Sequence, residues 1–206
     1  MVNTSSLDTR SLDLRDLDRR ALEAARGPIA QVGPAHLTRP TPCAHWNLGD
    51  LLRHLVNENR GFAAAAAGLR VARSLWDGGE LGADPHRAYQ ESAAEVTAAF
   101  AVEDIDERPV EIREFGVRSG RSAMAMHFLD CLVHGWDVAV SLGVPYDPDE
   151  ESVAAALLIA SRWADVPGLR GPGAPFAALV PVSDEADGFA RLLGLVGRTP
   201  TWTPPC

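Results

Sequence analysis

The fold is decided by the stretch SGRSAMAMHFLDCLVHGWDVAVSL, residues 119–142, which is followed by Gly143 and Pro145. It contains no proline, and its apolar residues recur at helical spacing. A glycine just beyond the last periodic residue, with a proline after it, is typical of the end of a helix. The sequence therefore predicts one long helix from Ser119 to Leu142.

One face of this predicted helix carries short polar side chains, which we call the polar seam. At about 100° per residue they fall within an arc of roughly 80°. The seam consists of His127, Asp130, His134, Asp137 and Ser141. Solvated helix faces usually carry long arginine or glutamate side chains, which this seam lacks. The pattern alone leaves two interpretations open, a solvated face and a metal site.

The seam has no cationic residue near it in the sequence, because the flanking arginines are Arg121 and Arg162. A semi-buried carboxylate needs a positive partner, since an unpaired buried charge is costly, and a metal ion would supply one. Asp130 and His134 are spaced i, i+4, so both side chains leave one helix face a turn apart. We expect a third ligand from a facing helix, where His54 borders an apolar stripe.

Composition excludes several classes of function. The 19 cationic residues are all arginine, and with 28 acidic residues the net charge is -9 at pH 7. This balance argues against non-specific binding to nucleic acid and against adsorption on anionic membranes. The absence of lysine excludes Schiff-base and pyridoxal phosphate chemistry. The sequence also lacks the signature motifs of serine hydrolases, zincins, CxxC redox proteins and dinucleotide-binding folds.

The termini and cysteines bear on the compartment. Met1 to Arg20 has no apolar core of a signal peptide, and no run approaches the roughly 18 apolar residues of a membrane span. Cys43, Cys131 and Cys206 are far apart and indicate reduced thiols, with Cys131 an inert one. We expect a cytoplasmic protein without nucleic-acid or membrane partners, and a homodimer is compatible with the sequence.

The rest of the chain is also predicted to be mainly helical. The expected helices cover 7–26, 47–67, 84–101, 149–164 and 185–196, with a short hairpin at 109–117 and loops at 27–45 and 166–181. Asn47 and Asp84 are the expected N-caps of two of these helices. Long helices with few strands predict an all-α helical bundle that ends in a short C-terminal helix. Residues 1–206 are expected to form a single domain, with about 166–206 as an extension packed on it.

Three segments, in order along the chain, carry a family resemblance. They are Thr41 to Trp46 together with Asp50 to Leu55, then Asp130 to Ala139 with its HGWD element, and the tail from Phe189 to Trp202. These segments resemble the DinB-like metalloprotein superfamily, in its branch of mycothiol-dependent maleylpyruvate isomerase metal-binding domains. The resemblance covers nearly the whole chain and implies a DinB-like four-helix bundle that holds a divalent metal.

By this resemblance the metal ligands would be His54, Asp130 and His134, and the metal would be zinc or nickel, with iron as a further candidate. The isomerase has a glutamate where this chain has Asp130, which is a shorter side chain. The isomerase also carries an additional C-terminal domain that contributes to its active site. The resemblance implies a metal-dependent transferase or isomerase that acts with a low-molecular-weight thiol, such as mycothiol, on a small electrophilic substrate.

Other residues near the expected site have two interpretations each. Glu58, one turn after His54, is a candidate general base or hydrogen-bond acceptor, and equally a solvated glutamate. His127 is a candidate support for a metal ligand, although a core histidine with satisfied hydrogen bonds is favoured. Asp137 is expected to fix local structure rather than to catalyse. Trp46 and Trp136 are expected to be packing residues.

Two alternative functions remain open. One is a non-catalytic, regulatory module that binds a metal or a ligand, and the other is a bundle whose metal site has decayed. Catalysis predicts an open metal with at most three protein ligands. A structural metal predicts a fourth ligand, His127 or Glu58.

Overall fold

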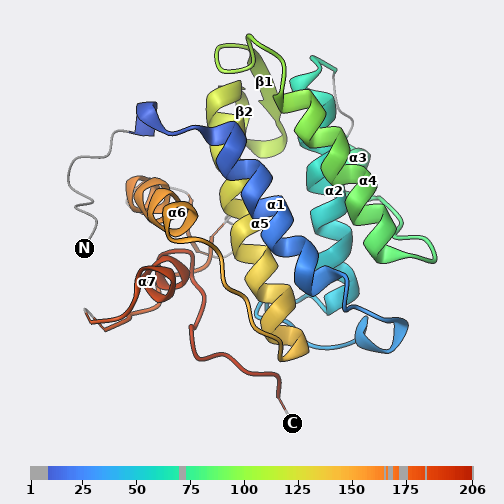
Figure 1. Ribbon diagram of the computed structural model, residues 1–206, viewed down its shortest axis with the longest axis vertical. Helices are drawn as coiled ribbons and strands as arrows, with labels where there is room; N and C mark the ends of the chain where they lie inside the picture. Colours follow the sequence, from blue (N-terminus) through green and yellow to red (C-terminus); the bar gives the residue numbers. More distant parts are fainter. Residues whose placement is uncertain are drawn as a thin grey trace. The chain divides into compact units, whose positions relative to one another are not determined.

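The structure is a computed structural model that describes residues 9–69, 73–164, 166, 169–171, 176–183 and 185–205. The chain forms two compact units, one of Leu14–Tyr146 with Pro204–Cys206, and one of Met1–Asp13 with Asp147–Thr203. Both units contain helices, and the described part of the chain is mainly helical, as the sequence predicts (Figure 1). The single domain with an extension from about residue 166 remains a prediction.

The larger unit is a four-helix bundle. Its helices are α1 (Leu14–Ile29), α2 (Leu48–Ala66), α4 (Pro85–Phe100) and α5 (Gly120–Leu142). Both α1 and α2 pack against α4 and α5, so that the four helices enclose one core (Figure 1). A short helix α3 (Arg73–Asp77), which the sequence did not predict, packs on α2. The bundle confirms the predicted fold class.

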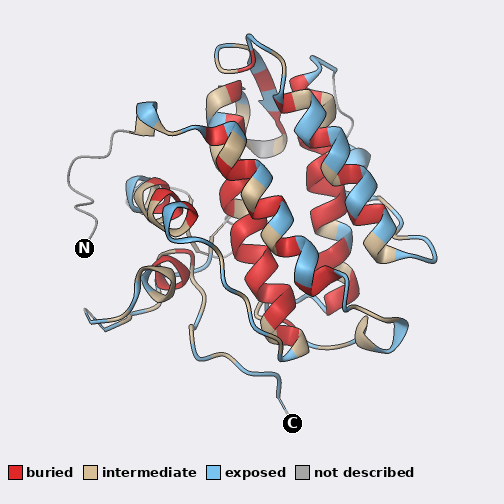
Figure 2. Cartoon of the chain, in the orientation of Figure 1, coloured by how far each residue is buried: buried red, intermediate tan, exposed pale blue. Residues whose placement is uncertain are grey.

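Helix α5 is buried along most of its length, as the red colouring in Figure 2 shows. Phe128, Leu132 and Val138 belong to the core, but the polar seam is buried too except for Asp130, which is half-buried. His134 is 8% exposed, while His127 is fully buried. Because α1 and α2 both pack on α5, its polar side does not face water. The interpretation of the seam as a solvated face is therefore wrong.

The ends of the bundle helices follow the sequence closely. Asn47 caps α2, where its side chain accepts a hydrogen bond from the Asp50 N–H at 2.9 Å and Asp50 accepts one from the Asn47 N–H at 3.2 Å. Asp84 caps α4 and Ser119 caps α5, each through a side chain that accepts one hydrogen bond from a backbone N–H of the first turn. Gly143 ends α5 with a φ of 74°, the left-handed conformation that favours glycine. The caps predicted at Asn47 and Asp84 and the helix end predicted at Gly143 are confirmed.

The boundaries of α1 differ from the prediction. The helix begins at Leu14 after a short 3-10 turn and ends at Ile29 instead of residue 26. Pro28 is tolerated in the last turn because it costs only one hydrogen bond there, and both Pro28 and Ile29 are buried. Burial thus outweighs the local preference of Gly27 and Pro28 for a loop. The predicted start at residue 7 lies outside the described residues.

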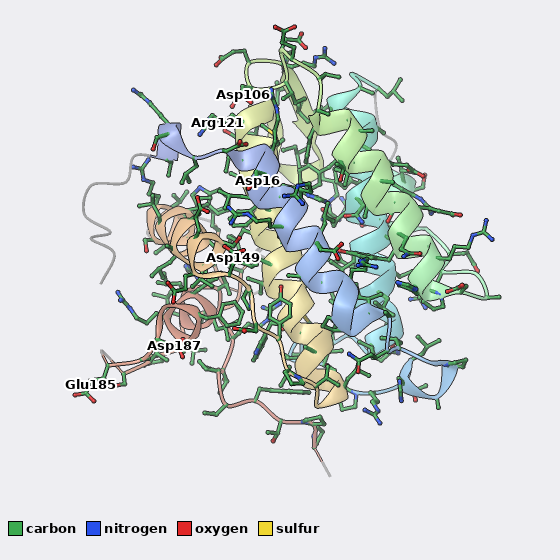
Figure 3. All side chains as sticks on the ribbon, in the orientation of Figure 1. Asp16, Asp106, Arg121, Asp149, Glu185 and Asp187 are labelled. Carbon is green, nitrogen blue, oxygen red and sulfur yellow. The ribbon has the colours of Figure 1, made fainter. Side chains whose placement is uncertain are left out.

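A small antiparallel hairpin precedes α5 and confirms the predicted hairpin. Strand β1 (Pro109–Ile112) pairs with β2 (Gly116–Ser119), so that Pro109 lies opposite Ser119. Arg121 Nη1 lies 3.3 Å from Asp106 Oδ2, and Figure 3 shows this pair at the start of α5. The turn between the two strands, Arg113–Phe115, belongs to the same unit as α2.

The smaller unit contains α6 (Glu150–Trp163) and α7 (Gly188–Leu195), which pack on each other. Their N-caps are Asp149 and Asp187, labelled in Figure 3. Because Asp187 is the cap, α7 begins at Gly188 rather than at the predicted residue 185. No helix in the described part of the chain has the length and apolar character needed to cross a membrane.

Candidate metal centre

Helices α2 and α5 bring together the three side chains that the sequence predicts as metal ligands. His54 lies on α2, and Asp130 and His134 lie one turn apart on α5. The Nε2 atoms of His54 and His134 are each 3.4 Å from Asp130 Oδ1. All three donor atoms lie within 4.8 Å of one another. We call this group the first donor set.

The first donor set has the spacing that a metal ion requires. Nitrogen and oxygen ligands at about 2.0–2.1 Å from zinc, at a tetrahedral angle, stand about 3.3 Å apart. The two distances of 3.4 Å match this value closely. Asp130 Oδ2 is in addition buried without a hydrogen-bond partner among the described residues. Buried polar atoms are rarely left without a partner. A cation bound at this place would give Asp130 Oδ2 such a partner.

Burial and the neighbouring carboxylates set the protonation of the three side chains. Burial lowers the pKa of His54, against the opposing effect of Asp130, so its imidazole is neutral, the form that binds metals. Burial disfavours the charged form of His134 as well, but Asp130 and then Asp137 outweigh it and raise its pKa. For Asp130, burial is outweighed by His134 and His54, which hold its pKa well below the usual range. Asp130 is therefore a carboxylate.

Each imidazole has a second carboxylate on its other side. Asp137 Oδ2 lies 2.8 Å from His134 Nδ1, and Glu58 Oε1 lies 3.7 Å from His54 Nδ1. A carboxylate only accepts, so the His134 Nδ1–H donates to Asp137, while Nε2 faces Asp130. Carboxylates that orient metal-binding histidines in this way are common.

Glu58 is not solvated, since it is 4% exposed. Its Oε1 lies 2.5 Å from Arg113 Nη2, and Arg113 Nη1 lies 3.1 Å from Asp77 Oδ1. The Arg113 guanidinium also stands over the Trp76 ring, 5.2 Å from its centroid. The sequence did not predict an arginine at this site. Arg113 comes from the hairpin turn, whereas α5 itself has no cationic residue between Arg121 and its end.

His127 has partners of its own in the core. Its Nδ1 lies 2.7 Å from Asp18 Oδ1, and its Nε2 lies 2.9 Å from Asn59 Oδ1. Asn59 donates through its amide nitrogen to Ser92 Oγ, so its oxygen accepts and both His127 nitrogens donate. Burial opposes the resulting charge, but Asp18 outweighs it and raises the pKa of His127 well above the usual value. This is the arrangement expected of a core histidine, and it ties α5 to α1 and α2.

Two residues beside the donor set were not predicted as part of it. Cys43 Sγ lies 3.3 Å from Asp137 Oδ2 and 3.9 Å from His134 Nδ1. The Trp46 ring lies 4.7 Å from that of His54, measured between centroids, and Trp46 is 37% exposed. Trp46 therefore covers the edge of the site instead of packing in the core.

A tight turn before α2 places both residues. Thr41 Oγ1 accepts a hydrogen bond from the Cys43 N–H at 3.1 Å and donates to the Trp46 carbonyl at 2.8 Å. The ends of the turn are held together because Pro40 and Asn47 form a bridge. The sequence signal for this turn is the threonine and proline at positions 41 and 42, just upstream of the N-cap.

Residues 19–139, which run from α1 to α5, match the family described as the mycothiol maleylpyruvate isomerase N-terminal domain. The chain belongs to this family. The matched stretch contains the whole first donor set together with Cys43 and Asp137.

Two proteins of Mycobacterium tuberculosis are similar to most of the chain. The chain is 32% identical over 179 residues to the uncharacterized protein MT0763 of Mycobacterium tuberculosis (strain CDC 1551 / Oshkosh), covering 87% of this chain and 94% of that protein. The uncharacterized protein Rv0738 of Mycobacterium tuberculosis (strain ATCC 25618 / H37Rv) gives the same values.

Solved structures of the mycothiol-dependent maleylpyruvate isomerase share the fold. One has a TM-score of 0.59 at 14% identity, over 82% of this chain and 77% of that chain. A mutant of the isomerase has a TM-score of 0.58 at 15% identity, over 76% and 71% of the two chains. The predicted resemblance to this family is confirmed.

Proposed function

We propose that this protein is an enzyme that depends on a divalent metal, zinc, nickel or iron, and acts with a low-molecular-weight thiol such as mycothiol on a small electrophilic substrate. The reaction would be a transfer of the thiol or a thiol-assisted isomerisation. One observation carries the proposal: two imidazole nitrogens stand 3.4 Å from one carboxylate oxygen, at metal-ligand spacing. The family to which the chain belongs supports the choice of mycothiol.

The surroundings of the set favour catalysis over a structural metal. Neither candidate for a fourth protein ligand is directed to that role, because Glu58 pairs with Arg113 and His127 pairs with Asp18. A three-residue set leaves coordination positions for a thiol or a substrate oxygen. The exposure of Trp46 beside His54 supports access from solvent to these positions.

Each residue has a role in this proposal. His54, Asp130 and His134 hold the metal, which when bound favours the thiolate form of a thiol or polarises a carbonyl. Asp137 keeps the proton of His134 on Nδ1, and Glu58 steadies the Nδ1 side of His54. Since Arg113 contacts the same oxygen of Glu58 that faces His54, we assign Glu58 to positioning rather than to proton transfer.

The test is consumption of mycothiol by Ni²⁺-loaded protein in the presence of a panel of small electrophiles, maleylpyruvate included. We expect turnover by the wild type, loss of turnover in Asp130→Ala, and unchanged turnover in His86→Ala, a control histidine on α4. A wild type that binds metal but neither consumes thiol nor isomerises any electrophile would contradict catalysis and leave the regulatory module.

A further inference from the structure

His134 presents its two ring nitrogens to different groups. Its Nε2 faces the first donor set, whereas its Nδ1 faces Asp137 Oδ2 at 2.8 Å and Cys43 Sγ at 3.9 Å. Cys43 Sγ and Asp137 Oδ2 are 3.3 Å apart. These three donor atoms also lie within 4.8 Å of one another, and we call them the sulfur set.

The sulfur set has the composition and the spacing of a zinc site. Thiolate, imidazole and carboxylate are the ligand types that zinc uses in proteins. With about 2.3 Å to sulfur and about 2.0–2.1 Å to nitrogen and oxygen, a tetrahedral ion places sulfur about 3.6 Å from each of the other atoms and nitrogen about 3.3 Å from oxygen. The observed sulfur distances of 3.3 and 3.9 Å lie on either side of the expected value, whereas the 2.8 Å between nitrogen and oxygen is a hydrogen-bond distance that must widen when an ion binds.

The site can adjust and can be reached. Asp137 and His134 are fixed on α5, whereas Cys43 lies in the turn before α2 and is half-buried. Rotation of the Asp137 side chain would widen the space between Nδ1 and Oδ2 that a hydrogen bond now spans, and Cys43 in its turn could follow that movement. The turn side is therefore the route by which an ion would enter.

We infer that the sulfur set is a second cation site, which takes thiophilic divalent ions such as Zn²⁺ and Cd²⁺. On binding, the Cys43 thiol releases one proton to solvent, since a coordinating thiol is deprotonated. His134 coordinates through Nδ1 as the neutral imidazole, so its Nδ1 proton goes to solvent and the remaining proton is on Nε2, which faces Asp130 Oδ1. A neutral imidazole coordinates through one nitrogen at a time, so the two sets compete for His134.

The competition separates metals by softness. Thiolate selects soft ions, whereas imidazole and carboxylate without sulfur suit Ni²⁺ and Fe²⁺ as well. A thiophilic ion in the sulfur set withdraws His134 from the first donor set and thereby lowers turnover. Only this effect on turnover rests on the proposed function, because the sulfur set itself is independent of it.

The test is a titration with Cd²⁺ followed by the ultraviolet sulfur-to-cadmium charge-transfer band. Asp130→Asn protein is used, because it weakens the first donor set and leaves the sulfur set complete. We expect the band to saturate at one Cd²⁺ per chain. Adding Cys43→Ser should abolish the band, whereas adding Cys131→Ser, the matched control for a thiol of the bundle, should retain it.

Absence of the band at saturating Cd²⁺, or its survival in Cys43→Ser, would overturn the inference and leave Cys43 as a hydrogen-bond donor to Asp137. Loss of the band in Cys131→Ser would also overturn it. Failure of the first donor set is seen separately, as Ni²⁺ binding to the wild type that Asp130→Asn does not weaken.

Discussion

Asp137→Asn tests how the protein orients its metal-binding imidazole. The Asp137 carboxylate is fully buried and accepts the His134 Nδ1–H at 2.8 Å, which leaves Nε2 directed at Asp130. An asparagine of the same size has no charge and a single acceptor, and it buries an amide NH₂ beside His134. Loss of such a supporting carboxylate typically weakens metal binding by about 10–100-fold, or about 1.4–2.7 kcal/mol.

The assay is competition for Ni²⁺ against a chelator of known affinity, with the folded fraction checked by circular dichroism. The control is Asp104→Asn, whose side chain is 70% exposed and pairs only with surface Arg108 among the contacts described. We expect unchanged affinity in the control. If folded Asp137→Asn bound Ni²⁺ as tightly as the wild type, the orienting role of Asp137 would be refuted.

Three further predictions concern the core. Asp18→Asn should cost about 3–5 kcal/mol in urea unfolding below pH ~6.5, because it leaves a buried charge on His127 unpaired. The raised pKa of His127 makes this contribution complete below its unfolded pKa and lost as pH rises through the folded value, so a pH-independent difference would contradict it. Gly61→Ala places a Cβ 2.3 Å from the Trp76 ring. After the gain in helix propensity is subtracted, it should lower the free energy of unfolding by about 1–2 kcal/mol, and a variant more stable than the wild type would contradict this packing. Burial raises the pKa of Cys131 to about 11, so iodoacetamide should label it only after unfolding, and peptide mapping of native protein checks this.

The fold could be predicted because its signals are local. The caps at Asn47 and Asp84 and the glycine at 143 bound helices whose apolar spacing is clear. The predicted end of α1 is wrong by three residues, because the burial of Ile29 depends on tertiary packing that the local sequence does not show. The burial of the polar seam is likewise set by the neighbours of α5, not by its sequence.

The candidate site was predicted only in part for the same reason. The i, i+4 spacing of Asp130 and His134 is a property of one helix, so it could be predicted from the sequence. His54 could be predicted because it lies on a facing helix, beside an apolar stripe. Arg113 reaches Glu58 through the hairpin turn, and Cys43 reaches His134 through the turn before α2. Such contacts between distant segments depend on loop conformation, which periodicity does not describe.

The central claim is that His54, Asp130 and His134 hold one divalent ion. It is tested most directly by elemental analysis of Ni²⁺-loaded, desalted protein, made in a Cys43→Ser background so that the sulfur set cannot take the ion. One Ni²⁺ per chain is predicted, with loss of the ion in His54→Ala and in Asp130→Ala. Protein without stoichiometric metal, or variants that retain it fully, would contradict the account.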